Sequence, residues 1–192
     1  MTQDELLLDV IRRLNKLGVI YMLTGAYAVS FHGEPRATHD IDIKINLQTK
    51  DITSIYENFK RDFYIGKDMV EDAVKEQRMF NIIHLDTGIK VDFWISKDAN
   101  FDRLRMERRT KDSFLGEPVY VASPEDTILV KLEWFKNSES EKHWRDALSI
   151  LKVSKKNLDY NYIEKWAKEL GILDVWKKIK KTEDPERKSS TF

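Results

Sequence analysis

The stretch Leu23-Thr24-Gly25-Ala26, followed by 13 residues and then by Asp40-Ile41-Asp42-Ile43, decides the fold of this chain. The apolar run Val19–Leu23 is short and rich in strand-forming residues, and a glycine turn ends it. Residues 26–31 then have a helical composition that Gly33 closes. The sequence therefore predicts a strand, a tight turn and a short helix. The N-terminus of that helix offers backbone N–H groups and a positive dipole end to a phosphate.

Residues 40–45 alternate strictly between polar and apolar side chains. In a strand this alternation places the isoleucines on one face and Asp40 and Asp42 on the other. The two aspartates are then about 6.5 to 7 Å apart at the backbone. Two carboxylates at this spacing can share a hard divalent cation. Mg²⁺ is usually held by one or two carboxylates together with substrate phosphates.

A third carboxylate lies in a second pair of predicted strands. Phe80–Leu85 and Ile89–Ile95 are strand-like runs, and the turn Asp86-Thr87-Gly88 between them favours a hairpin. Asp92 falls on the polar side of the second run. Three converging acids can hold two metal ions that clamp an in-line displacement at phosphorus. The predicted catalytic and metal-ligating residues are Asp40, Asp42 and Asp92.

An Asp-x-Asp pair alone is ambiguous. On most strands it is a solvated polar face, and glycosyltransferases use the same pair to hold a metal-bound sugar nucleotide. The preceding strand, glycine turn and helix favour phosphate chemistry, because they would set a phosphate site opposite the metal site. A glycosyltransferase needs a larger nucleotide domain than this chain provides, so we rank that alternative last.

These motifs resemble the nucleotidyltransferase superfamily, which includes DNA polymerase β, the aminoglycoside nucleotidyltransferases and the minimal nucleotidyltransferases. The shared pattern is an apolar-Gly pair, a gap, Asp-apolar-Asp-apolar, and a later apolar-Asp-apolar. The longer stretch Gly25–Asp42 is similar in particular to the AbiEii-like branch, whose members include toxins of bacterial and archaeal toxin–antitoxin systems. The resemblance covers Leu23 to about Ile95 and, more loosely, Ser123–Leu151.

The resemblance implies an α+β fold: a nucleotidyltransferase-like mixed β-sheet with flanking helices, followed by a C-terminal helical bundle. We expect the sheet core over residues 1–120, the helical region over 121–180 and a flexible tail over 181–192. The implied reaction moves an NMP from an NTP to a hydroxyl acceptor, with Mg²⁺ (or Mn²⁺) as the metal cofactor. The acceptor is an RNA or tRNA, a protein or a small molecule, and a toxin would have an antitoxin partner.

The resemblance also implies nucleotide contacts. Arg36 and Thr38 match the branch's Arg-x-Thr-x-Asp-x-Asp, and a guanidinium suits phosphate oxygens. Lys131 lies in Pro124–Leu132, which matches Pro-Glu-Asp-x-Ile-x-x-Lys-Leu, with an implied contact to the triphosphate. Asp146 resembles a late Asp motif with a nucleotide or metal contact. The predicted nucleotide-binding residues are Gly25, Ala26, Arg36, Thr38, Lys131 and Asp146.

Each of these side chains has a structural alternative. Arg36 can form a surface salt bridge, and Lys131 can reach solvent or a charged partner from its core-facing stripe. Asp146 can belong to a solvated helix face. Ala26 stands where the family usually has Gly or Ser, so a serine hydroxyl contact is lost unless Thr24 replaces it. This departure keeps open a second function, a catalytically degenerate nucleotide-binding or partner-binding module of the same fold.

Composition excludes several classes of protein. The 192 residues contain 33 Lys and Arg, 33 Asp and Glu and no cysteine, so a disulfide framework and a cysteine zinc site are excluded. The apolar runs are shorter than the roughly 18 residues of a membrane span, and the N-terminus is acidic, so we expect a soluble, cytoplasmic protein. Zero net charge gives no general attraction to nucleic acid. The basic run Arg103–Lys111 is either a solvated face or a contact to an RNA acceptor.

Overall fold

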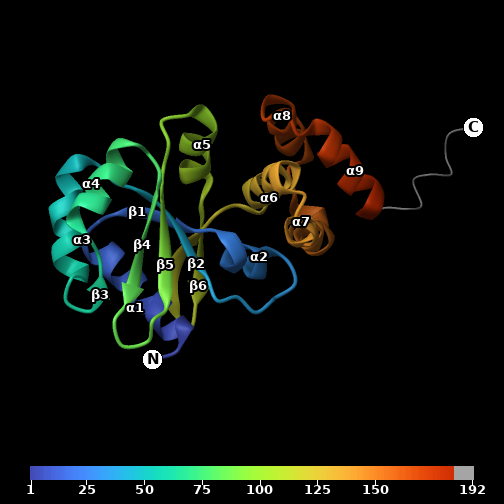
Figure 1. Ribbon diagram of the computed structural model, residues 1–192. Helices are drawn as coiled ribbons and strands as arrows, with labels where there is room; N and C mark the ends of the chain where they lie inside the picture. Colours follow the sequence, from blue (N-terminus) through green and yellow to red (C-terminus); the bar gives the residue numbers. More distant parts are fainter. Residues whose placement is uncertain (184–192) are drawn as a thin grey trace, which may run out of the picture. The chain divides into compact units, whose positions relative to one another are not determined.

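The computed structural model describes residues 1–183, which form two compact units (Figure 1). The sheet unit consists of Met1–Tyr27 and Ala37–Ala122. Among the described residues, the helical unit consists of Ala28–Arg36 and residues 123–183. The predicted α+β class, with a mixed sheet followed by helices, is confirmed.

The two units and the predicted regions have different boundaries. Residues 28–36 belong to the helical unit, although they lie inside the predicted core over 1–120. The division falls within helix α2 (Gly25–His32). The predicted tail begins inside helix α9 (Leu173–Glu183), and its remainder, 184–192, lies outside the described residues.

Strands account for much of the sheet unit. They are β1 (Ile20–Leu23), β2 (Ile41–Asn46), β3 (Phe63–Tyr64), β4 (Met79–His84), β5 (Lys90–Ile95), β6 (Thr110–Phe114) and β7 (Glu117–Val121). Within residues 1–183 these seven strands form one sheet in the order β3-β4-β5-β2-β1-β7-β6. The pairs β2–β5 and β1–β7 are parallel, and the other neighbours are antiparallel. The predicted hairpin is therefore confirmed as β4 and β5.

Helices flank the sheet and build the second unit. The helices of the sheet unit are α1 (Gln3–Lys16), α3 (Ile52–Phe59), α4 (Lys67–Lys75) and α5 (Asn100–Arg108). Those of the helical unit, besides α9, are α6 (Pro124–Ser138), α7 (Glu141–Ser154) and α8 (Tyr160–Glu169). Helix α6 begins with an N-cap, since Ser123 Oγ accepts the Asp126 N–H at 3.1 Å. Among the described residues, no helix has both the length and the apolar character that a membrane crossing needs.

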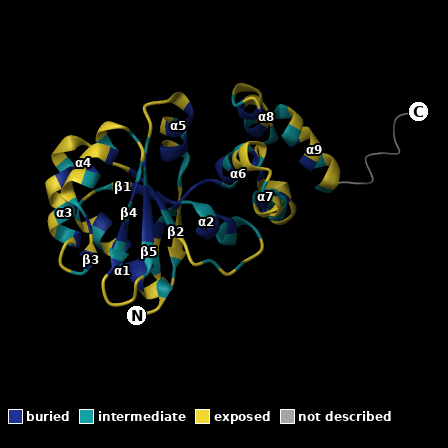
Figure 2. Ribbon diagram, viewed as in Figure 1, coloured by how far each residue is buried: buried dark blue, intermediate teal, exposed yellow. Residues whose placement is uncertain are grey.

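Alternation along the strands gives the sheet one apolar face. On that face the ring of Phe59 in α3 lies 5.3 Å from the ring of Phe63 and 6.1 Å from that of Phe93. Phe80 and Phe93 from neighbouring strands lie 5.2 Å apart. Figure 2 shows that the central strands are largely buried and that the outer faces of the helices are exposed. The polar side chains of β2 and β5 therefore emerge on the opposite face.

Two elements of the sheet unit lack an apolar pattern in the sequence. The edge strand Thr110–Phe114 is almost entirely exposed, so it has no apolar alternation. Helix α5 buries Asp102 and Arg105 alongside Phe101 and Met106, so it lacks an apolar stripe. These elements are defined by their tertiary partners.

Candidate active site

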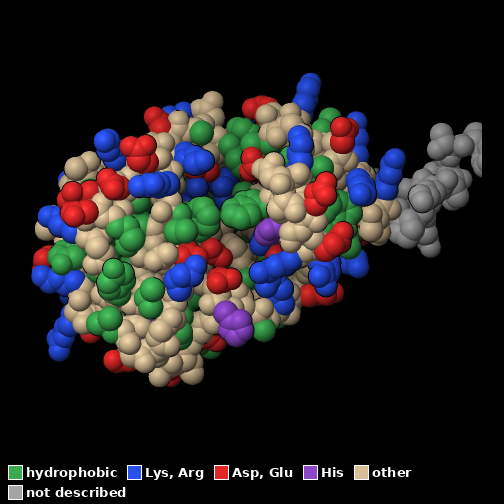
Figure 3. All heavy atoms as spheres, in the orientation of Figure 1, with side chains coloured by type: hydrophobic (Ala, Val, Ile, Leu, Met, Phe, Trp, Pro, Cys, Tyr) green, Lys and Arg blue, Asp and Glu red, His purple; other side chains and the backbone are tan. Residues whose placement is uncertain are grey.

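The central strands bring two of the predicted acids together. Asp42 on β2 and Asp92 on β5 are register partners on adjacent parallel strands, which lie about 4.8 Å apart. The side chain of Asp92 is only 10% exposed, whereas Asp42 is half-buried. Asp40 precedes β2 and is exposed. We name Asp40, Asp42 and Asp92 the acid cluster. In the space-filling view, acidic side chains gather over this part of the sheet (Figure 3).

A lysine pairs with the acid cluster. Lys90 lies two residues before Asp92 on the same face of β5, and its Nζ donates a hydrogen bond to Asp92 Oδ2 at 2.6 Å. This bond raises the pKa of Lys90 above its ordinary value, and the charges of Asp92, Asp40 and Asp42 add to the effect. One ammonium group therefore interacts with all three carboxylates. Lys90 was not predicted as a site residue, although strand alternation places it beside Asp92.

The second oxygen of Asp92 has no partner. Asp92 Oδ1 is buried and accepts no hydrogen bond from the described residues. An unsatisfied buried polar atom costs about 1–3 kcal/mol in stability. Asp92 is therefore the member of the acid cluster whose hydrogen-bonding capacity is only half used within residues 1–183.

Asp42 is held on two sides. Trp94 Nε1–H donates to Asp42 Oδ1 at 3.1 Å, and the Thr24 N–H donates to the Asp42 carbonyl at 3.0 Å. Gly25 packs against the other carboxylate oxygen so closely that a Cβ at residue 25 would overlap Asp42 Oδ2. Gly25 also has a φ of +59°, which L residues rarely adopt. The first residue of α2 is therefore glycine for both steric and conformational reasons.

The start of α2 and the loop before β2 surround the same acids. Ala26 is 4% exposed, so its methyl group is buried within the protein. Thr38 Oγ1 accepts the Asp40 N–H at 3.1 Å, which fixes the turn that leads into β2. The predicted nucleotide contacts of Gly25, Ala26 and Thr38 remain predictions.

The helical unit joins the other three predicted residues in one ion-pair network, which we name the Asp146 group. Arg36 donates from Nε to Asp146 Oδ1 at 2.8 Å and from Nη2 to Oδ2 at 3.0 Å. Lys131 Nζ lies 2.8 Å from Asp146 Oδ2. Burial raises the pKa of Asp146, but the bonds from Arg36 and Lys131 outweigh burial and leave that pKa below its ordinary value.

Two hydrogen bonds connect the end of α2 and the residues that follow it to α7. The Glu34 N–H donates to Ser149 Oγ at 2.6 Å, and Ser154 Oγ donates to the His32 carbonyl at 2.7 Å. Asp146 is 3% exposed, which excludes the solvated helix face. Lys131 has the charged partner that its core-facing position requires. The predicted nucleotide contacts of these residues remain predictions.

A second buried network lies on the polar face of the sheet. Lys44 Nζ lies 2.7 Å from Asp102 Oδ2, which also accepts the Lys97 N–H at 2.9 Å. Arg105 Nη1 lies 3.2 Å from Asp102 Oδ1. Helix α5 therefore covers this face at Lys44, and Arg105 from the basic run Arg103–Lys111 is buried. That run is not a uniformly solvated face.

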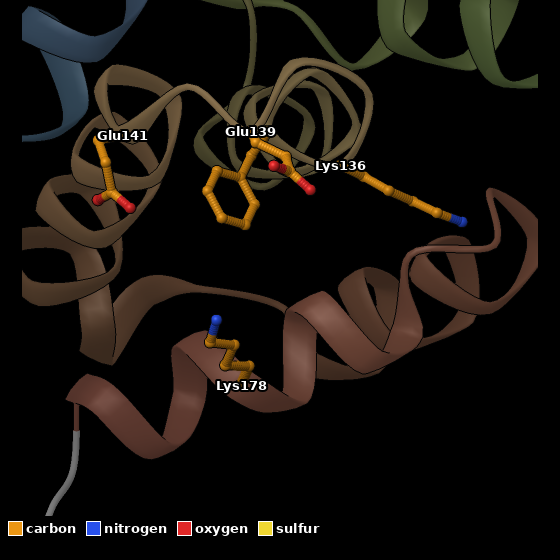
Figure 4. Close-up of a pocket in the computed structure, with 5 residues that line it drawn as sticks. Lys136, Glu139, Glu141 and Lys178 are labelled. Carbon is orange, nitrogen blue, oxygen red and sulfur yellow. The ribbon is translucent and has the colours of Figure 1, made fainter.

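The helical unit also has a surface hollow of about 370 Å³, shown in Figure 4. Glu139, Glu141 and Lys178 point toward the hollow, whereas Lys136 extends away from it and donates to the Gly171 carbonyl at 2.8 Å. None of the predicted site residues lines it. The residues around the hollow are Phe135, Lys136, Glu139, Glu141 and Lys178.

The acid cluster has the ligand chemistry of a divalent-ion site. Among residues 1–183, no group of three or more His, Cys, Asp or Glu side chains has the arrangement of a metal site. The oxygens of Asp40 and Asp42 are nevertheless the ligand type that Mg²⁺ prefers, and Mg²⁺ needs only one or two of them besides phosphates. Lys90 already neutralises part of the cluster's charge. The residues present therefore fit one divalent cation.

Comparisons with known proteins give no match by sequence: no protein-family model and no curated protein matches the chain. Solved structures do match. An antigenic nucleotidyltransferase-like protein from Paracoccidioides brasiliensis is 15% identical with a TM-score of 0.55, over 92% of this chain and 91% of that one.

Two antibiotic-related proteins match as well. The lincosamide antibiotic adenylyltransferase LnuA, bound to lincomycin, is 13% identical with a TM-score of 0.52, over 80% of this chain and 98% of its own. ANT(2")-Ia in complex with adenylyl-2"-tobramycin is 14% identical with a TM-score of 0.52, over 89% and 98% of the two chains. At such low identity these similarities establish architecture alone. The chain therefore has the mixed α/β fold of nucleotidyltransferase-like proteins.

Proposed function

We propose that this protein is a metal-dependent nucleotidyltransferase that moves an NMP from an NTP to a hydroxyl acceptor. The observation that carries the proposal is the contact between Gly25 and Asp42, next to Asp92. It joins the first turn of a helix, which attracts phosphate, to carboxylates, which attract a divalent ion. Phosphoryl transfer depends mainly on bringing those two functions together.

The nucleotide is held by the sheet unit in this proposal. The backbone N–H groups of Gly25 and Ala26 bind phosphate oxygens at the N-terminus of α2. Asp40 and Asp42 hold Mg²⁺ or Mn²⁺, and Asp92 completes the acid cluster. The ion, when bound, supplies positive charge that neutralises the triphosphate. Trp94 keeps the Asp42 carboxylate in place through its indole N–H.

The reaction follows from this arrangement. The acceptor oxygen forms a bond to the α-phosphorus, and the bond from that phosphorus to the bridging oxygen of the β-phosphate breaks. Pyrophosphate leaves with the electron pair of that bond. The proton of the acceptor hydroxyl passes to the carboxylate of Asp92, whose Oδ1 accepts no hydrogen bond from residues 1–183. Positioning and charge neutralisation provide most of the catalysis.

The fold relatives suggest a class of acceptor. LnuA is a lincosamide adenylyltransferase, and ANT(2")-Ia carries an adenylylated tobramycin. We propose a small molecule with hydroxyl groups as the first acceptor to test, and ATP as the first nucleotide. The AbiEii-like resemblance keeps RNA, tRNA or a protein as further acceptors, in a cytoplasmic toxin–antitoxin role with an antitoxin partner.

Labelling tests the proposal directly. The protein is incubated with Mg²⁺ or Mn²⁺ and each α-labelled NTP, with separate additions of aminoglycosides, lincosamides, total RNA and total protein. We expect label on one acceptor class, and a loss of about 1,000-fold in Asp42→Asn. The matched control is Asp86→Asn, an exposed turn aspartate outside the acid cluster, which should label like the wild type. Equal labelling by wild type and Asp42→Asn, or no labelled acceptor, would contradict the proposed enzymatic function.

Ala26 is the observation that favours a second candidate, a nucleotide-binding module without activity. In this structure its buried methyl group presents no hydroxyl to a phosphate. Calorimetry with Mg·ATP separates the two functions. Tight binding without transfer to any acceptor supports the module, whereas absence of binding contradicts both.

A further inference from the structure

We infer that Lys90 takes the place of a second metal ion, so that the site binds one divalent ion through Asp40 and Asp42 and keeps Asp92 as the proton acceptor. This inference rests on the proposed function and specifies how its metal site is built. In this arrangement Lys90 has a role at the site, and Asp92 is not a metal ligand.

The ammonium group of Lys90 lies beside Asp92, where a second ion would bind. Lys90 Nζ lies 2.6 Å from Asp92 Oδ2, at hydrogen-bond distance. A magnesium ion bound by the same oxygen would need to lie at about 2.0–2.1 Å from it. The paired ions of two-metal sites are only about 3.5–4 Å apart. An ammonium group at Asp92 therefore occupies the region that a second ion would need.

The charges of the cluster also favour a single ion. Lys90 Nζ is paired with Asp92 at 2.6 Å, so it lowers the net negative charge of the three carboxylates from three to two. The cluster therefore attracts a second divalent ion less strongly than three unpaired carboxylates would. A second divalent ion would add positive charge beside an ammonium that is already there. Repulsion between the two cations then favours a single ion.

The remaining oxygen of Asp92 supports its role as the proton acceptor. Lys90 holds Oδ2, while Oδ1 is buried without a hydrogen-bond partner. The side chain of Asp92 is only 10% exposed, whereas that of Lys90 is 42% exposed. Solvent therefore reaches the lysine stem more readily than the carboxylate. The acceptor hydroxyl supplies the hydrogen bond that Oδ1 lacks and leaves its proton there.

Counting bound manganese tests the inference without measuring activity. The full chain is titrated with Mn²⁺ in the presence of α,β-methylene-ATP, and the protein-bound ions are counted by electron paramagnetic resonance and calorimetry. We expect one ion per chain for the wild type and two for Lys90→Gln. Asp92→Asn should keep one ion, and the double variant Lys90→Gln/Asp92→Asn should return to one, because the second ion needs Asp92.

Matched controls keep the result interpretable. Lys67→Gln removes an exposed lysine of α4, 4.0 Å from Glu71, and should bind one ion. If Lys90→Gln does not fold, Lys90→Met keeps the aliphatic stem and is measured instead. Two ions on the wild type, or one ion on every folded Lys90 variant, would overturn the inference while NMP transfer stands. No ion on the wild type overturns the inference, and absence of labelling then overturns the proposed function separately.

Discussion

The acid cluster of the sheet unit and the Asp146 group of the helical unit combine the same kinds of side chain with opposite results. The acid cluster sets three carboxylates against one lysine, and Asp92 keeps a buried oxygen without a partner. The Asp146 group sets two cations against one carboxylate, and both oxygens of Asp146 are bonded. Among residues 1–183, the first arrangement leaves a buried carboxylate oxygen without a hydrogen bond, whereas the second bonds both oxygens of its aspartate. The comparison contrasts an excess of carboxylates with an excess of cations.

The largest expected effect is on the free energy of unfolding, for a substitution in the Asp146 group. Asp146→Asn removes the charge that balances Arg36 and Lys131 and leaves two cations close together in a buried place. We expect the free energy of unfolding to fall by about 3–5 kcal/mol, measured by urea denaturation. The same assay on Asp42→Asn should show a change below about 1 kcal/mol, because Asp42 is half-buried among like charges. Equal losses from the two variants would abolish the distinction between the two regions.

The next effect is on activity, at the glycine that touches the acid cluster. Gly25→Ala introduces a Cβ that overlaps Asp42 Oδ2. The new alanine would also have a strained φ. We expect NMP transfer to fall by about 100-fold, since a small misplacement of a catalytic group has that cost. Gly18→Ala is the control, because Gly18 has a φ of +66° and no atom within 4 Å of its Cβ position. That variant should lose about 1 kcal/mol of stability and no activity; similar activity losses in both would contradict the steric argument.

The pH dependence of stability provides a smaller difference. The pKa of Asp146 lies below its usual value of 3.8 because the bonds from Arg36 and Lys131 outweigh burial. A depressed pKa in the folded state contributes stability above the unfolded value, and that contribution is lost as pH falls through the folded pKa. The difference in stability between wild type and Asp146→Asn should therefore become smaller as pH falls below 3.8. Thermal unfolding at a series of pH values measures this difference. A gap that stays constant at low pH would show that the charge of Asp146 is not the cause.

The smallest expected effect concerns the hydrogen bond that orients Asp42. Trp94→Phe keeps an aromatic ring and removes the indole N–H that donates to Asp42 Oδ1 at 3.1 Å. We expect kcat/KM to fall by about three- to tenfold, in line with the loss of one hydrogen bond. Trp134→Phe, at an exposed residue of the helical unit, should have no effect. An unchanged rate in Trp94→Phe would show that Gly25 and the backbone suffice to place Asp42.

Local periodicity explains what could be predicted from the sequence. The alternation in residues 40–45 places Asp42 on the polar face of β2, and the structure confirms that strand. The hairpin around Asp86-Thr87-Gly88 is confirmed as well. Each of these depends on residues that are close together in the chain, so a pattern of side chains is enough.

The residues that were missed depend on distant partners. Lys90 and Trp94 lie on the same strand face as Asp92, but only pairing with β2 shows that they reach the acids of that strand. Lys44 follows the polar alternation of β2, yet α5 buries it against Asp102. Alternation assigns a face of the sheet and contains no information on which helix will cover it.

The sequence by itself determined the kinds of group at the site: a glycine turn that starts a helix, and aspartates on the polar face of strands. Only the tertiary structure decided that β2 pairs with β5 in parallel, with Asp42 opposite Asp92. It also placed Lys90 on one oxygen of Asp92 and left the other unpartnered. The physical reason is that strand order and register are set by packing of the whole apolar face, which joins segments about 50 residues apart, whereas backbone geometry fixes alternation within a single strand.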